Sequence, residues 1–222
     1  MGAERALEEA LKQAKLQRED IDAMVTTGYG RTAITDGDKS ITEITCHARG
    51  AHFLNPEVRT VIDIGGQDTK IICVEQGFVK DFMMNDKCSA GTGRFLEIMA
   101  NTLSMRPNEM CELAREGSGV TISSMCTVFA ESEVISLIGQ GEKKENIAFA
   151  VVDSIVRKVA AQANRMSEDR PMLCLTGGLC ECSYISEALT KELGMEVKTD
   201  PQSRYAGAIG AALGAVKKGK KN

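Results

Sequence analysis

The chain has 222 residues, of which 43% are hydrophobic and 26% are charged, and its formal net charge is -4. This composition is typical of one or two globular domains with a buried core, and the only basic cluster, KKGKK near the end, argues against an extended nucleic-acid-binding surface. No apolar run is long enough to span a bilayer, and the start of the sequence lacks a secretion signal. We therefore predict a cytoplasmic protein that binds neither nucleic acid nor membrane.

The chain opens with alternating helical and extended patterns. Helices are predicted at 5–16 and 41–54, with a short strand at 21–26 between them. The second helix carries Cys46 and His47 side by side. Because neighbouring residues of a helix point to different faces, this pair is not suited to chelate a metal alone, and we expect structural roles for both.

Three apolar runs then predict a β-hairpin extended to three strands, at 61–64, 70–74 and 78–83. The turn after the first run combines Asp63, Gly65, Gly66, Gln67 and Asp68. Glycines let a backbone approach phosphate closely, and a carboxylate at the end of a strand can hold magnesium, directly or through water. A phosphate loop and a plain Gly-Gly hairpin turn are both compatible with this segment.

The second half of the chain carries further regular elements. They are two helices that follow Gly93 and Cys126, a helix at 146–165, a strand at 172–176, a helix at 184–193, a strand at 196–199 and a small-residue helix at 206–216. The strand at 172–176 ends in Gly177 and Gly178. A strand followed by two glycines and a helix is the layout in which ligands lie at the carboxyl ends of a sheet. Close packing alone would also explain these glycines.

Two of the eight cysteines each precede a helix. Cys88 is followed by a turn of small residues and a helix with one apolar face, and Cys126 leads into a helix that we expect to begin with Thr127 as its N-cap. A helix N-terminus favours negative charge, which lowers the pKa of a thiol and suits it to bind a soft metal. Burial of both thiols as small core residues is the other interpretation.

The remaining cysteines are interpreted as structural. A disulfide framework is not expected in a reducing cytoplasm, and the absence of a CxxC motif argues against a zinc site within one chain. Cys73 and Cys174 lie in apolar strands, so we predict that both belong to the core. Cys180 and Cys182 form a CxC pair that is too close for paired zinc ligands, and we interpret it as incidental.

Five segments together resemble one family of proteins: DIGGQDTK, MNDKCSAGTGRFLEIMANTL, ISSMCTVFAESEVIS, LTGG and YAGAIGAALGA. They are similar to the activator ATPases of 2-hydroxyacyl-CoA dehydratases, which are relatives of the ATPase subunits of benzoyl-CoA reductase. The resemblance runs from about residue 20 to the end of the chain. It implies an α/β actin-like ATPase (ribonuclease-H-like) fold and a homodimer that shares one oxygen-sensitive [4Fe-4S] cluster.

The resemblance also implies a function. ATP hydrolysis with Mg²⁺ would drive a low-potential electron, received from a ferredoxin or flavodoxin, from the cluster to the partner dehydratase or a related reductase. Carried over by motif, Cys88 and Cys126 are the cluster ligands. Asp63 and Gln67 are catalytic, whereas Gly65, Gly66, Asp68, Gly177 and Gly178 bind the nucleotide. A cubane cluster takes four thiolates, so two copies that each contribute two cysteines complete its coordination.

Members of this family begin with a hairpin that carries a first phosphate loop, and this chain starts at the helix that should follow it. We therefore expect two subdomains, of which the first is incomplete: 1–58 from the first subdomain, 59–200 for the second, and 201–222 as a helix that returns to the first. We also expect the strand at 21–26 to lack sheet neighbours and the chain to be a poor ATPase. The alternative functions are a non-hydrolysing iron-sulfur dimer and a small-molecule kinase of the same superfamily.

Overall fold

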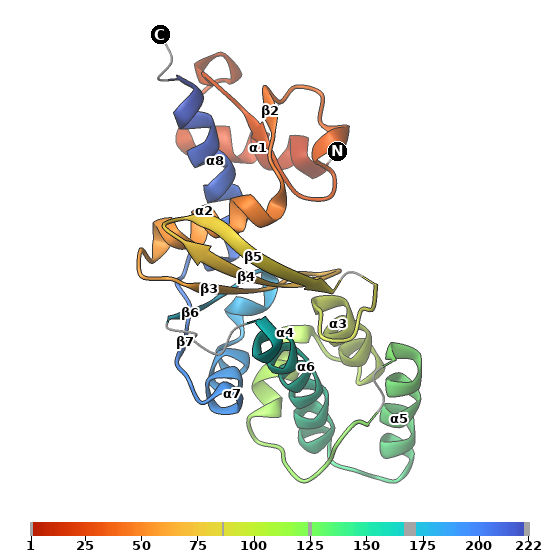
Figure 1. Cartoon of the computed structure of the whole chain (residues 1–222). Helices are drawn as coiled ribbons and strands as arrows, with labels where there is room; N and C mark the ends of the chain where they lie inside the picture. Colours follow the sequence, from red (N-terminus) through yellow and green to blue (C-terminus); the bar gives the residue numbers. More distant parts are fainter. Residues whose placement is uncertain (1, 86, 124–125, 167–171, 220–222) are drawn as a thin grey trace.

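The computed structural model describes residues 2–85, 87–123, 126–166 and 172–219. Its centre is a mixed five-stranded sheet (Figure 1) with the order β5-β4-β3-β6-β7. The strands are β3 (Thr60–Ile64), β4 (Thr69–Glu75), β5 (Phe78–Asn85), β6 (Leu173–Thr176) and β7 (Val197–Lys198). Neighbours are antiparallel from β3 to β5 and parallel from β3 through β6 to β7. The predicted hairpin of three strands is confirmed.

Helices cover both faces of this sheet. One face packs against α2 (Glu43–Leu54), which in turn packs against α8 (Ala206–Gly219). The opposite face packs against α6 (Lys144–Met166), and α7 (Ser183–Leu193) packs against β7. The helices α3 (Gly93–Thr102) and α4 (Pro107–Ala114) pack against α6 and belong to the same core. Successive side chains of a strand point alternately to the two faces of the sheet. Ile62 and Ile71 pack in the core on the α6 side, whereas Val61 and Ile72 pack in the core on the α2 side.

The contact between α2 and α8 depends on small residues. A Cβ atom added at Gly210 would lie 1.8 Å from the carbonyl oxygen of Cys46, and one at Gly50 would lie 1.8 Å from that of Ala206. Only glycine permits such close approach of two helix backbones. The small residues of α2 and α8 therefore let the two helices pack closely together.

The first residues form a smaller group of elements around α8 (upper part of Figure 1). They are α1 (Gly2–Ala14), η1 (Arg18–Asp20), β1 (Val25–Thr26), η2 (Arg31–Ala33) and β2 (Lys39–Ser40). The strand predicted at 21–26 is only two residues long, and residues 21–24, between η1 and β1, have no regular structure. It is not without a neighbour, since β1 pairs with β2 in parallel, and that expectation was wrong.

Other sequence-based boundaries agree with the structure or differ by at most three residues. The helix after the second cysteine motif is α5 (Thr127–Gly139), but Cys126 and not Thr127 occupies its N-cap position. The patterns missed α4 and β2, and the 3₁₀ turns η3 (Gly178–Glu181) and η4 (Ser203–Tyr205) were not predicted. Within the described ranges, no helix is both long and apolar enough to cross a membrane. The division of the chain after residues 58 and 200 stays a prediction.

Candidate functional site

The two predicted glycine loops meet at one edge of the sheet. Asp63 on β3 lies beside Thr176 on β6 in the parallel register, and the Thr176 hydroxyl donates a hydrogen bond to Asp63 Oδ1 at 2.9 Å. Gly177 follows with a φ of 83°. A Cβ atom there would lie 2.4 Å from the Ile64 carbonyl oxygen and 2.7 Å from Asp63 Oδ1, so the approach of the two loops requires glycine.

The first loop is a tight turn around a buried carboxylate. The Gly65 amide donates to the Asp68 carbonyl at 2.9 Å, and a Cβ atom at Gly65 would lie 2.8 Å from Asp68 Oδ1. Asp68 is buried and accepts a hydrogen bond from the Tyr29 hydroxyl at 2.8 Å, whereas Gly66 and Gln67 are exposed. The backbone of these two residues is therefore accessible to a ligand. Gly66 and Gln67 also line a hollow of about 440 Å³.

A buried lysine joins the carboxylates of this site. The Lys70 ammonium lies 3.2 Å from Asp63 Oδ2, 2.5 Å from Asp68 Oδ1 and 2.9 Å from Glu43 Oε1. Burial alone would lower the pKa of this ammonium. The charge of Asp63 and the hydrogen bonds to Asp68 and Glu43 outweigh burial, and the pKa of Lys70 is raised above its usual value.

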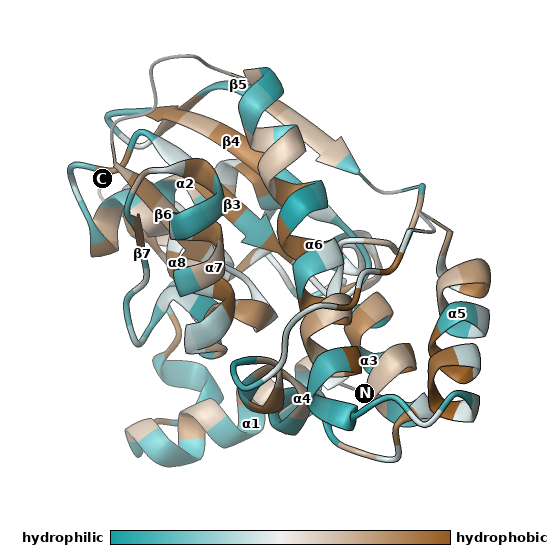
Figure 2. Cartoon of the chain, turned by 90° about the horizontal axis from the view of Figure 1, so that it is seen from below, coloured by the Kyte–Doolittle hydropathy of each residue, from teal (hydrophilic) through white to brown (hydrophobic). Residues whose placement is uncertain are grey.

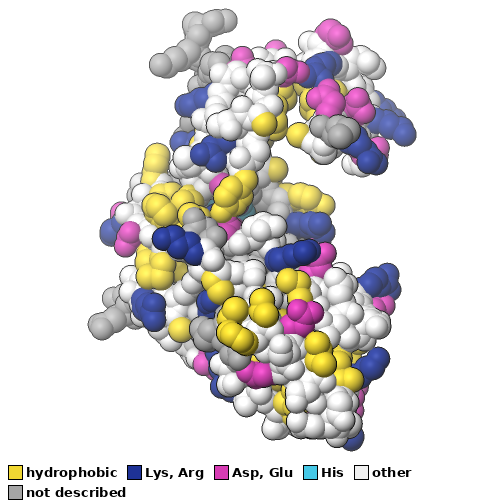
Figure 3. All heavy atoms as spheres, turned by 90° about the vertical axis from the view of Figure 1, so that its right-hand side faces the viewer, with side chains coloured by type: hydrophobic (Ala, Val, Ile, Leu, Met, Phe, Trp, Pro, Cys, Tyr) yellow, Lys and Arg dark blue, Asp and Glu magenta, His cyan; other side chains and the backbone are white. Residues whose placement is uncertain are grey.

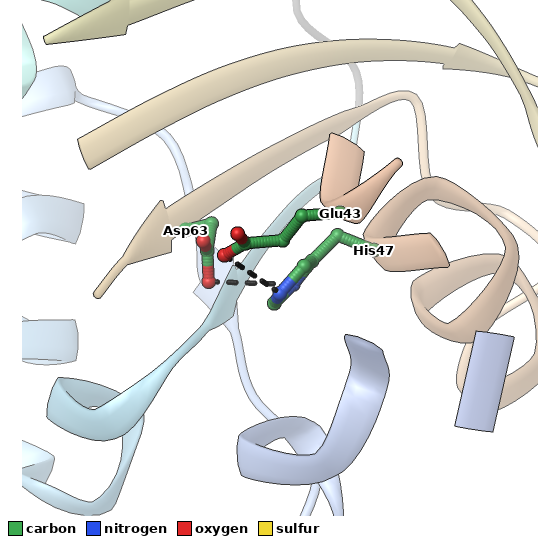
Figure 4. A group of neighbouring side chains, drawn as sticks. All are labelled: Glu43, His47 and Asp63. Carbon is green, nitrogen blue, oxygen red and sulfur yellow. Dashed lines mark ion pairs between the residues drawn. The ribbon is translucent and has the colours of Figure 1, made fainter. Parts of the chain in front are cut away.

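Helix α2 contributes two further side chains to the same cluster (Figure 4). Glu43 and His47 point toward Asp63, with His47 Nδ1 3.3 Å from Asp63 Oδ1 and His47 Nε2 3.9 Å from Glu43 Oε1. His47 Nδ1 also lies 3.2 Å from the Thr176 hydroxyl. The ligand atoms of Glu43, His47 and Asp63 lie within 4.8 Å of one another, a spacing that would allow a divalent cation. The structure thus places His47 among the candidate site residues, and its expected structural role stays a prediction.

The cysteines separate into two groups by burial. Cys46, Cys111, Cys174, Cys180 and Cys182 are buried, and burial raises the pKa of the Cys174 thiol to about 11. A thiol with a raised pKa stays protonated at neutral pH and is a poor metal ligand. The pKa of the Cys182 thiol is instead lowered, by a hydrogen bond with Cys111. Cys88 is half-buried and Cys126 is exposed, whereas Cys73, expected in the core, is only partly buried.

The segments that carry Cys88 and Cys126 lie next to each other. The residues that follow these cysteines, Ser89 and Thr127, share a hydrogen bond of 2.7 Å between their hydroxyl oxygens. Neither α3 nor α5 has an acidic residue in its first turn. The N-termini of both helices can therefore attract an anionic group without local repulsion.

Hydrogen bonds connect the first glycine loop to the segment that follows Cys88. The Gly93 amide donates to the Gly65 carbonyl and the Arg94 amide donates to the Gly66 carbonyl, both at 2.9 Å. The Thr69 hydroxyl donates to the Gly91 carbonyl at 2.6 Å. A displacement of the loop would therefore be transmitted directly to the first turn of α3.

Comparison with known proteins decides the family. The model of the BadF/BadG/BcrA/BcrD ATPase family matches residues 2–215. This chain belongs to that family. The predicted actin-like α/β ATPase fold and the assignment to an ATPase family are thereby confirmed.

Several proteins that are similar to this chain have assigned activities. The chain is 46% identical to the (R)-2-hydroxyglutaryl-CoA dehydratase activating ATPase of Acidaminococcus fermentans, over 99% of the chain and 85% of the relative. It is 45% identical to the activator of lactoyl-CoA dehydratase of Anaerotignum propionicum, over 96% and 82%. A solved structure of the activator of the 2-hydroxyisocaproyl-CoA dehydratase from Clostridium difficile with bound ADPNP has a TM-score of 0.94 at 41% identity, over 98% of this chain and 82% of that one.

Proposed function

We propose that this protein is an ATP-dependent activator that delivers a low-potential electron to a 2-hydroxyacyl-CoA dehydratase or a related acyl-CoA reductase. The observation that carries the proposal is that Cys88 and Cys126 lie on adjacent segments beside the proposed ATPase site. The relatives named above are activators of such dehydratases, and the electron donor to this protein would be a ferredoxin or flavodoxin.

Cys88 and Cys126 are suited to hold half of a [4Fe-4S] cluster. Cys126 is exposed, and Cys88 is partly buried at the margin of the core. Their two segments are joined by the Ser89–Thr127 hydrogen bond, and each leads into a helix whose first turn is free of carboxylates. Such a cluster needs four ligands and would supply one-electron chemistry. Two copies of this chain related by a two-fold axis would bring four thiolates together.

An exposed apolar face supports the dimer. Val128, Phe129, Ile135 and Ile138 of α5 are large hydrophobic residues at the surface, although the helix also buries Ala130 and Val134. In Figure 2, α5 stands at the edge of the molecule and carries hydrophobic stretches. Figure 3 shows the side of the molecule on which α5 lies in Figure 1, and hydrophobic side chains are visible on the lower half of this side. A second copy would cover this apolar surface beside Cys126.

The roles of the nucleotide residues follow from their positions. The exposed backbone of Gly66 and Gln67 is suited to cradle phosphate together with the partly buried Gly65, and we assign Gln67 and the buried Asp63 to orienting the attacking water. Asp68 would hold Mg²⁺ through water, because its carboxylate is already held by Lys70 and Tyr29. Gly177 and Gly178, at the end of β6, would flank the adenosine.

The hydrogen bonds between the loop and α3 give ATP a route to the cysteines. The carbonyls of Gly65 and Gly66 accept hydrogen bonds from the amides of Gly93 and Arg94. A phosphate that shifts either loop glycine would therefore also move these amides. These amides belong to the first turn of the helix that Cys88 precedes. ATP turnover would thus alter the surroundings of Cys88, which is what coupling of hydrolysis to electron transfer requires.

The test is an anaerobic activation assay with MgATP, dithionite and the iron-loaded protein. The lactoyl-CoA, 2-hydroxyglutaryl-CoA and 2-hydroxyisocaproyl-CoA dehydratases are assayed in parallel. We expect wild type and Cys73→Ser, a control at another accessible cysteine, to activate at least one dehydratase only when ATP is present. Cys88→Ser and Cys126→Ser should activate none. Activation by Cys88→Ser at the wild-type rate, or activation without ATP, would contradict the proposal.

A further inference from the structure

Lys70 has an unusual position for a lysine. It lies in the middle of the sheet, directly opposite Asp63 in the antiparallel register of β3 and β4, and only 1% of its surface is exposed. A buried ammonium is costly unless it is paired and fully hydrogen-bonded. Its three partners come from three separate segments: Asp63 from β3, Asp68 from the loop and Glu43 from α2.

The hydrogen-bonding capacity of this ammonium is filled. A lysine ammonium has three N–H donors and no acceptor. Lys70 has carboxylate oxygens at 2.5, 2.9 and 3.2 Å, one for each donor. No donor is left for a phosphate oxygen while these three contacts persist.

We propose that Lys70 is a positioning residue of the ATPase site, an internal cation that fixes the carboxylates of Asp63, Asp68 and Glu43 and does not itself contact the nucleotide. The inference rests on the proposed roles of Asp63 and Asp68 in hydrolysis. It adds a residue that lies outside the glycine loops and explains why a lysine occupies a core position of β4.

The other contacts of the two loop carboxylates complete the arrangement. Asp63 Oδ2 faces Lys70, while Asp63 Oδ1 accepts from Thr176. Asp68 Oδ1 faces Lys70, while Asp68 Oδ2 accepts from Tyr29. Each carboxylate is therefore held at both oxygens, and the ammonium is the contact that the two have in common. Preorganised groups of this kind do not have to reorient during the reaction.

Lys70 also joins the sheet to α2. Its contact with Glu43 is made to the first residue of that helix, and Glu43 is more accessible than the two aspartates, with 24% of its side chain exposed. Because burial is outweighed by the surrounding carboxylates, the raised pKa of Lys70 keeps the ammonium charged through the neutral range.

The experiment measures kcat and KM for MgATP, together with ADP affinity, in Lys70→Met. The matched control is Lys80→Met, the same change on the neighbouring strand at a lysine whose side chain is 70% exposed. For Lys70→Met we expect kcat to fall by at least about 100-fold, as for loss of a preorganised electrostatic contact, while KM and ADP affinity change by less than about threefold. Lys80→Met should match wild type.

Two results would overturn the inference. A Lys70→Met protein with wild-type kcat would show that the ammonium positions nothing that matters for hydrolysis. A large rise in KM and loss of ADP affinity at unchanged kcat would make Lys70 a direct nucleotide ligand. ATP hydrolysis at the wild-type rate by Asp63→Asn and by Asp68→Asn would instead overturn the proposed roles of these aspartates, and the role of Lys70 with them.

A second variant keeps the test decisive if Lys70→Met does not fold. Glu43→Gln leaves an amide oxygen that can still accept from Lys70, and the partial exposure of Glu43 makes this change tolerable. We expect a smaller fall in kcat, with KM and ADP affinity again unchanged. A raised KM at wild-type kcat in this variant would contradict the inference.

Discussion

Gly177 and Gly178 are neighbours in the sequence but have different environments. Gly177 has a φ of 83°, and a Cβ atom there would collide with the Ile64 carbonyl oxygen, whereas a Cβ atom at Gly178 would meet no atom within 4 Å. The first glycine is required by the backbone and by the approach of β3. The second is required by neither.

The pair therefore allows a matched comparison by thermal unfolding. Gly177→Ala should lower the free energy of unfolding by more than about 1 kcal/mol, because alanine is strained at this φ and its methyl group clashes. Gly178→Ala should stay within about 0.5 kcal/mol of wild type. Equal midpoints for the two variants would contradict the placement of Gly177 against β3.

At the scale of residues, the sequence predicted the loops better than their surroundings. Asp63, Gly65 and Gly177 follow apolar runs, and that position marks them as the ends of strands. Lys70 was missed because a lysine within a strand is ordinarily expected on a solvated face. His47 was missed because its partner lies across the fold. The spacing of Glu43 and His47, four residues apart on one helix, was the available signal.

At the scale of elements, the start of α3 is fixed by the glycine loop. The Gly93 and Arg94 amides donate to the carbonyls of Gly65 and Gly66, and the Gly91 carbonyl accepts from the Thr69 hydroxyl. Thr69 is buried, and its hydroxyl provides the only side-chain contact among these three bonds. Removing that hydroxyl should weaken the connection without touching the loop backbone.

Thr69→Val should uncouple the two sites. In wild type we expect MgATP to speed the removal of iron by a chelator, and in Thr69→Val this acceleration should disappear while ATP hydrolysis continues. Stability should fall by about 1–2 kcal/mol, because a buried carbonyl loses its donor. Thr69→Ser should behave as wild type. The control is Thr60→Val, at a buried threonine at the start of β3. Acceleration by MgATP in Thr69→Val equal to that in wild type would refute the coupling.

Some elements could be predicted from the sequence more clearly than others. Strands β3 to β5 were predicted because apolar runs alternate with turn residues, and α6 because its apolar face persists over 23 residues. Helix α4 was missed because it spans only eight residues, and a proline at its first turn reads as a break. Strand β2 is only two residues long and both residues are exposed, so no hydrophobic pattern in the sequence marks it.

At the scale of the whole molecule, α5 exposes an apolar face that the proposed dimer would cover. Val128 is 67% exposed close to Cys126, and Val216 on α8 is 62% exposed elsewhere on the surface. The sequence showed the apolar residues of α5 but not which of them face outward, because both of its faces are apolar. That distinction depends on how α5 packs against α3 and α6.

Val128→Glu should weaken the dimer, whereas Val216→Glu should not. A glutamate at Val128 would place like charges near each other across the two-fold axis, which costs several kcal/mol and should raise the dissociation constant by more than about 100-fold. Sedimentation equilibrium under anaerobic conditions measures this constant. Equal dissociation constants for both variants would place the dimer contact away from α5.

The most direct test of the account is native mass spectrometry of the anaerobically prepared protein. The account predicts one species, a dimer that carries about four irons and four sulfides, as expected for one cluster with two cysteines from each copy. The double variant Cys88→Ser with Cys126→Ser should carry none, and Cys73→Ser should match wild type. A cluster bound to a monomer, or retained by the double variant, would contradict the account.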